Sequence, residues 1–282
     1  MRILVRTSRW AIWARRIGSL ALPVAFILVL MHRGNAITTQ SFAVVEAVAI
    51  VMALVALGCA IMAFVRIWIT GDHGWGKAVV GFLCGLVCLV PLGLWSFDYF
   101  RYPMVDEVST DQLNPPPLIS QTIAVPPSPA VMQAISKAFP NIKTRGYPID
   151  PAAIFRLVSQ LVAGRQWKVE RQLEPAPGQA GQINAIATTL FGFRDEVSIR
   201  IAAVSGGSSV AMRSVSLSTL HEPGVNGSRI ESFLTALDDR VTARLKNLPA
   251  GSDIAADADT DTDAAPVPAV PMPNPPIRGK RR

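Results

Sequence analysis

The order of hydrophobic and polar positions divides the chain into an apolar first part and a mixed remainder. Long runs with almost no charge cover residues 42–69 and 75–97, and a shorter run covers residues 17–37. A helix needs about 20 apolar residues to cross the hydrocarbon core of a bilayer. The pattern therefore predicts a transmembrane region at residues 17–97 that contains three transmembrane helices.

The first of these runs has the weakest signal. It contains Pro23 and reaches residue 37 only if the side chains of His32 and Arg33 extend to the membrane surface. Its arginine-rich flank also resembles a secretory signal, with Gly34-Asn35-Ala36 as a small-x-small cleavage site. Two further spans favour an uncleaved anchor, and a third alternative is a helix that lies on the membrane surface.

Charge predicts the orientation of the helices. The net charge of +7 comes largely from basic residues before the first run. Cytoplasmic flanks of membrane helices are enriched in Lys and Arg, so we expect a cytoplasmic N-terminus at residues 1–16 and three crossings of a bacterial inner (cytoplasmic) membrane. The soluble part is then periplasmic, and it would face the cytoplasm if the first run did not cross. The basic residues are Arg2, Arg6, Arg9, Arg15 and Arg16.

The remainder of the chain predicts one soluble domain between two irregular segments. Residues 98–130 are rich in proline, which indicates an extended linker, and residues 131–249 carry the regular patterns. Residues 250–282 are acidic, then proline-rich, then basic. Such a composition buries too little apolar surface to order itself, so we expect a disordered tail.

Local signals predict the elements of the soluble domain. Asp150 followed by Pro151 predicts the start of a helix that ends at Gly164, and Ser228 with Glu231 three residues on forms a capping box for the last helix. Between these helices lie four strand-like segments, at residues 167–173, 182–193, 196–204 and 208–218.

Short connections between these strands favour antiparallel neighbours. The predicted fold class is thus an α-helical membrane anchor followed by an α+β domain. In that domain an antiparallel four-stranded sheet has two flanking helices, in the order α-β-β-β-β-α.

Several motifs resemble a bacterial family, the domain of unknown function 1499 (DUF1499), over about residues 105–241. The motifs are Val108-Ser109-Thr110-Asp111 with Pro115-Pro116, Phe191-Gly192-Phe193-Arg194-Asp195-Glu196, Arg213-Ser214-Val215-Ser216, Gly224-Val225-Asn226 and Arg229-Ile230. The resemblance supports the domain boundaries and the membrane helices before the domain, and it implies no activity. The sequence departs from the family pattern at Leu217 and Glu222-Pro223.

One polar constellation is a candidate ligand site. Free N–H groups at a helix start, with two guanidinium groups nearby, favour an anion. An internal network is the alternative, in which Asp195 or Glu196 pairs with Arg213 and Asn226 holds the turn. The candidate ligand-binding residues are Arg213, Ser214, Ser216, Glu222, Asn226 and Arg229, and the candidate ionic network adds Arg194, Asp195 and Glu196.

The chemistry of the remaining residues narrows the function. His221 is the only histidine of the domain, and all three cysteines lie in the apolar runs, so we expect neither a metal site nor a cofactor. The sequence has no basic stripe interleaved with aromatic residues, so we expect no nucleic-acid partner. We expect a non-enzymatic envelope domain that binds a partner protein or an anionic envelope component beside the lipid bilayer. The alternative is a hydrolase-like envelope enzyme that uses Asp195, Glu196 or Glu222.

Overall fold

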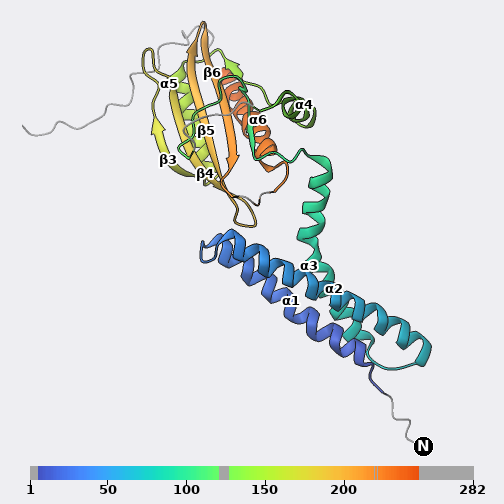
Figure 1. Cartoon of the computed structure of the whole chain (residues 1–282). Coiled ribbons are helices and arrows are strands. Elements are labelled where there is room, and N and C mark those ends of the chain that lie inside the picture. The colour runs from blue at the N-terminus through green and yellow to red at the C-terminus, as the bar shows by residue number, and fades with distance from the viewer. Residues whose placement is uncertain (1–5, 121–126, 219, 221, 248–282) are drawn as a thin grey trace, which may run out of the picture.

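A computed structural model describes residues 6–120, 127–218, 220 and 222–247. Residues 1–5 of the basic N-terminus, part of the predicted linker, His221 and the predicted tail at residues 250–282 lie outside the described residues. Three long helices are followed by a sheet with helices packed on it (Figure 1).

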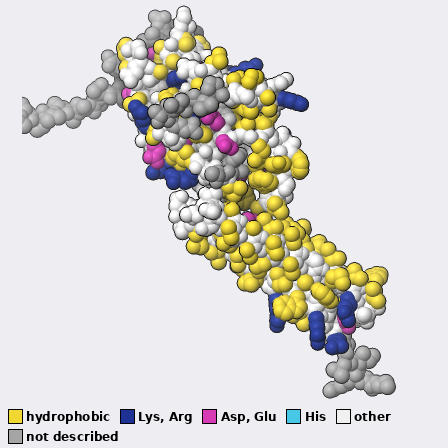
Figure 2. Space-filling view, in the orientation of Figure 1, with side chains coloured by type: hydrophobic (Ala, Val, Ile, Leu, Met, Phe, Trp, Pro, Cys, Tyr) yellow, Lys and Arg dark blue, Asp and Glu magenta, His cyan; other side chains and the backbone are white. Residues whose placement is uncertain are grey.

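The three long helices are α1 (Arg9–Arg33), α2 (Thr39–Thr70) and α3 (Trp75–Arg101). Each is long and apolar enough to cross a membrane. The first begins at Arg9, which is earlier than the pattern predicted, so Arg15 and Arg16 lie within the helix. Figure 2 shows hydrophobic side chains along the helices, with Lys and Arg gathered at the end away from the sheet.

Small side chains let the three helices approach closely. Ala11, Ala21 and Ala53 are fully buried between them, and a Cβ added at Gly81 would clash with the backbone of Ala14. Small residues are typical of helix contacts in membranes, where close backbone approach takes the place of hydrophobic burial.

The sheet is antiparallel and has six strands, a correction to the four that were predicted. The order is β1-β6-β5-β4-β3, and β2 also pairs with β6. The two additional strands have three residues each, which is too short to produce an alternating pattern. The strands are β1 (Glu107–Ser109), β2 (Arg145–Tyr147), β3 (Lys168–Leu173), β4 (Gly181–Thr188), β5 (Arg194–Val204) and β6 (Gly207–Ser216).

The helices α4 (Pro129–Ala138), α5 (Pro151–Gly164) and α6 (Val225–Asn247) complete the domain. Asp150 caps α5 as predicted, because its side chain accepts from Ala152 N. The last helix begins three residues before the predicted capping box. Glu231 does not close a box with Ser228, and its carboxylate accepts a hydrogen bond from the backbone N–H of Asn141.

The two faces of the sheet differ in what covers them. Helices α5 and α6 pack on the apolar face, where residues such as Ile199, Met212 and Phe233 are fully buried. A segment at residues 114–120, which we call the covering segment, crosses the polar face. Its Pro117 carbonyl oxygen accepts hydrogen bonds from Gln182, Asn184 and Ser198, at 2.7–3.0 Å. The backbone of this proline-rich segment thus satisfies polar side chains of the sheet.

Candidate functional site at the junction of the helices and the sheet

Arg213 lies on the polar face of β6, where its buried guanidinium pairs with the partly exposed carboxylate of Glu107. Its side chain is 1% exposed and donates two hydrogen bonds to the carboxylate of Glu107, at 2.7 and 2.8 Å. It also donates to the Pro116 carbonyl oxygen at 3.3 Å. Because neighbouring residues of a strand point to opposite faces, Arg213 is separated from Ser214 and Ser216.

Ser214, Ser216, Asn226 and Arg229 come together on the opposite face, beside the start of α6. Arg229 donates to Ser214 Oγ at 2.9 Å and to Asn226 Oδ1 at 2.8 Å, and it pairs with Asp195 at 2.5 Å. Asn226 Nδ2 donates to Ser216 Oγ at 2.9 Å. The ion pairs therefore join Asp195 to Arg229 and Glu107 to Arg213, which differs from the expected pairing of Arg213 with Asp195 or Glu196.

Glu196 fastens the covering segment to the sheet. Its carboxylate accepts from the backbone N–H groups of Ile119 and Ser120, at 2.6 and 3.0 Å, and from Asn184 at 3.2 Å. Burial by itself raises the pKa of Glu196, but these hydrogen bonds together hold that pKa below its usual value. Arg194 is exposed, and among the described residues its side chain forms no ion pair.

The loop between β4 and β5 contacts the turn between α1 and α2, and this contact joins the two parts of the molecule (Figure 1). His32 Nδ1 lies 2.7 Å from the Phe191 carbonyl oxygen. Arg33 donates to the carbonyl oxygens of Thr189 and Leu190, at 3.1 and 2.9 Å. The end of α1 therefore satisfies three successive carbonyl groups of a loop in the sheet domain.

Aromatic packing reinforces the same contact. The ring of Phe193 meets the ring of Phe42 edge to face, with centroids 5.7 Å apart, and His32 stacks on Phe42 at 4.5 Å. Gly192 allows this approach: its φ is +95°, and an added Cβ would lie 2.8 Å from the backbone nitrogen of Arg33. Only glycine meets both requirements without strain.

A cavity of about 290 Å³ opens beside this contact, between α2, α3 and the sheet domain. Most of its wall is apolar, and two carboxyl groups from different parts of the chain face it. The principal lining residues are Phe42, Glu46, Trp95, Phe193, Leu220 and Glu222.

Glu222 is the one predicted site residue that lines this cavity. Burial raises the pKa of its carboxyl group; a hydrogen bond from Thr189 lowers it, and the nearby charge of Asp195 raises it again. Asp98 adds a further raising effect, and Arg229 a lowering one. The surroundings of Glu222 are thus acidic, and the group favours its neutral form more than an exposed glutamate does.

Sequence reasoning missed the contribution of the first helices to this site. His32, Phe42 and Trp95 were assigned to membrane segments or their ends, and nothing in the sequence places them beside Phe191 or Glu222. The sequence placed the motif Phe191-Gly192-Phe193 in a strand at residues 182–193, which is wrong at its end, because β4 ends at Thr188 and the motif lies in the loop that follows. The motif still carried a usable signal, because a glycine inside a strand pattern indicates a bulge or close backbone approach.

Comparison with known proteins identifies the sheet domain. Residues 107–237 match the family described as "Protein of unknown function (DUF1499)". The sheet domain belongs to the DUF1499 family. The matched region of the DUF1499 domain includes Glu107, the Phe191–Phe193 loop, Arg213 and Arg229.

No curated protein matches the sequence. Among solved structures, "Crystal structure of Ara h 8.0201" aligns with a TM-score of 0.21 and 13% identity. The alignment covers 36% of this chain and 95% of that chain.

Proposed function

We propose that this protein is a multi-pass bacterial inner-membrane protein whose DUF1499 domain stands in the periplasm as a non-enzymatic binding module. We infer that it binds the apolar part of an envelope amphiphile in the cavity at the junction of helices and sheet. The observation that supports this proposal is that the cavity is mostly apolar and is lined by residues of α2, of α3 and of the DUF1499 domain. A molecule at the membrane surface can enter such a site without leaving the bilayer.

The charges around the cavity favour an amphiphile with a neutral or amine-bearing headgroup. Glu46 and Glu222 line the cavity, and Asp98 and Asp195 act on Glu222. The sequence predicted an anionic ligand because of Arg213 and Arg229. Each already holds a carboxylate within the domain, so an anion would have to displace Glu107 or Asp195. A partner protein docking at the same junction would bury the same apolar wall.

Ligand binding can be tested with two matched substitutions on α2. In Ala43→Trp the indole fills the cavity, whereas in Val44→Trp it points from the exposed neighbouring position, which does not line the cavity. The purified full chain in detergent is titrated with phosphatidylethanolamine, and retained lipid is counted by native mass spectrometry. We expect Ala43→Trp to weaken retention about tenfold, equal to about 1.4 kcal/mol, and Val44→Trp to leave it unchanged. Equal retention by the two variants would refute the cavity as the site.

Orientation has its own test. A reporter that is active only outside the cytoplasm, fused after Pro249, should be active in intact cells. A silent reporter would place the DUF1499 domain on the cytoplasmic side and would exclude periplasmic ligands.

An enzyme is the second candidate, and the raised pKa of Glu222 in a cavity favours it, because perturbed carboxyl groups in clefts are typical of general acids. Under that hypothesis, Glu222→Gln abolishes turnover of an envelope substrate while lipid retention persists. Loss of retention in Ala43→Trp, with no turnover by the unmodified chain, favours the binding module.

A further inference from the structure

A second cavity lies beside the start of α1, at the end of the helices away from the DUF1499 domain (Figure 1). It has a volume of about 450 Å³ and lies between the start of α1, the end of α2 and the turn that leads to α3. Three arginines and two tryptophans line it with a single acid. The charged and aromatic residues are Arg6, Arg9, Arg66, Trp10, Trp13 and Asp72.

The backbone at this end is held in place by hydrogen bonds. Ser8 N donates to the His73 carbonyl oxygen at 3.0 Å, and His73 N donates to the Arg6 carbonyl oxygen at 3.1 Å. These two bonds tie the segment before α1 to the turn between α2 and α3. The backbone of Arg6 and Ser8 is therefore held against this turn by main-chain hydrogen bonds.

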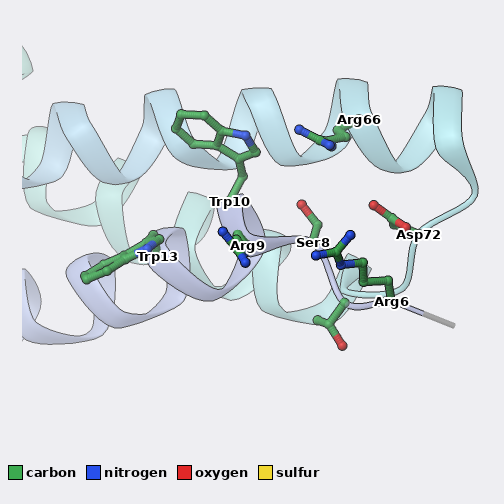
Figure 3. Close-up of a pocket in the computed structure, with 8 residues that line it drawn as sticks. Arg6, Ser8, Arg9, Trp10, Trp13, Arg66 and Asp72 are labelled. Carbon is green, nitrogen blue, oxygen red and sulfur yellow. The ribbon is translucent and has the colours of Figure 1, made fainter. Parts of the chain in front are cut away.

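The Ser8 hydroxyl and the arginines of the cavity lack partners within the part of the chain that the structure describes. Ser8 is 3% exposed, yet its Oγ has no hydrogen-bond partner among the described residues. Among the described residues, no carboxylate lies within ion-pair distance of Arg6, Arg9 or Arg66. This includes Asp72, the acid that lines the same cavity. Figure 3 shows the Ser8 hydroxyl among these three arginine side chains. A buried hydroxyl without a partner costs free energy unless a ligand supplies one.

The start of α1 adds a further positive potential. Ser8 occupies the N-cap position, its side chain makes no capping hydrogen bond, and the first turn contains no acidic residue. The free N–H groups of a helix start carry a partial positive charge that attracts anions. Guanidinium groups, a hydroxyl and a helix start thus converge on one space, and all of them are donors to oxygen.

We propose that this cavity binds the phosphate group of an anionic lipid headgroup. The source is a lipid because the cavity lies at the end of the apolar surface of the helices, where headgroups lie if the helices cross a bilayer. Trp10 and Trp13 are partly exposed beside it, as expected of side chains at the level of the headgroups. Basic pockets between membrane helices on the cytoplasmic side have this chemistry. The inference rests on the proposed membrane anchor and is independent of the junction cavity and its ligand.

The test measures binding of phosphatidylglycerol and phosphatidylcholine to the purified full chain in detergent by native mass spectrometry. Arg9→Gln with Arg66→Gln removes two guanidinium groups from the cavity, and Ser8→Ala removes the hydroxyl. Arg15→Gln is the control for each single arginine substitution, because it removes one guanidinium group from an exposed position of α1 that does not line the cavity. We expect the preference for phosphatidylglycerol to fall about fivefold for each guanidinium removed from the cavity, and to stay unchanged in Arg15→Gln.

Ser8→Ala tests the site without disturbing the fold, because the Ser8 Oγ makes no hydrogen bond in the described structure. We expect this variant to have unchanged helix content and a weaker preference for phosphatidylglycerol. Inorganic phosphate should displace the lipid only weakly, because it lacks acyl chains; full displacement at low millimolar phosphate would overturn the lipid as source. Equal losses in Arg15→Gln and in the cavity variants would overturn the site. Ala43→Trp should keep the preference for phosphatidylglycerol, so a failure of the proposed ligand site in the junction cavity can be told apart from a failure of this lipid site. Extraction of the chain from membranes by alkaline carbonate would refute the membrane anchor itself.

Discussion

His32 Nδ1, at the end of α1, lies 2.7 Å from the carbonyl oxygen of Phe191 in the DUF1499 domain. A carbonyl oxygen only accepts, so the His32 ring carries its proton on Nδ1. The other ring nitrogen lies 3.3 Å from Thr39 Oγ1, at the start of α2. One side chain thus connects α1, α2 and the loop of the sheet domain, and this contact fixes the wall of the junction cavity.

Gly192→Ala should separate the helices from the DUF1499 domain. The substitution adds a Cβ that would lie 2.8 Å from Arg33 N, in a backbone with φ of +95°. We expect a loss of about 1–2 kcal/mol from the backbone conformation and of about 1–3 kcal/mol from overpacking. Gly178→Ala is the control, because φ is +76° there and no atom lies near the added Cβ. Thermal unfolding in detergent should show the greater loss at Gly192; equal losses would contradict the contact.

The Glu107–Arg213 pair should be worth more than a partly exposed pair on the same face of the sheet. Glu107→Gln removes the carboxylate from a guanidinium that is 1% exposed, at an expected cost of about 3–5 kcal/mol. Asp111→Asn, which breaks the more exposed pair with Arg200, should cost about 0–1 kcal/mol. Urea unfolding measures both. In a double-mutant cycle with Arg213→Met, the two single losses should not add; additive losses would show that the pair contributes no coupling.

Acid should release the covering segment from the sheet. The pKa of Glu196 is lowered in the folded protein, so its stabilising effect is complete above the ordinary value of 4.5 and is lost as pH falls through the lowered pKa. We expect hydrogen exchange at the Ile119 and Ser120 amides to rise in that acid range and, in Glu196→Gln, to be raised already at neutral pH. Glu170→Gln, at an exposed ion pair with Lys168, should change neither amide.

Glu222→Gln should stabilise the protein at neutral pH. Burial raises the pKa of Glu222, so the stability linked to this group is complete below the ordinary value of 4.5 and is lost as pH rises through the raised pKa. A glutamine keeps an acceptor for Thr189 without a charge. The melting temperature should therefore exceed that of the unmodified chain at pH 7–8 and converge with it below about pH 4.5. An unchanged difference across this range, or the same gain in exposed Glu174→Gln, would contradict the buried carboxyl.

Much of the candidate site followed from local signals, and the rest did not. Ser214 and Arg229 of the candidate ligand site meet Asp195 of the candidate network at the start of α6, and their binding of a ligand stays a prediction. The partner of Arg213 was missed because Glu107 is more than 100 positions away, in a strand of three residues that has no periodicity of its own. The linker composition at residues 114–120 gave no sign that its carbonyl groups would serve the polar face of the sheet.

The sequence by itself determined the three apolar helices, the four long strands and the cap of α5, because those features depend on the period of hydrophobic positions and on side chains within a few residues. Only the tertiary structure decided which charges pair, that the sheet has six strands, and that His32, Phe42 and Glu222 share one site. These contacts join residues far apart in the chain, and neither spacing nor composition specifies which of many compatible partners comes within hydrogen-bond distance.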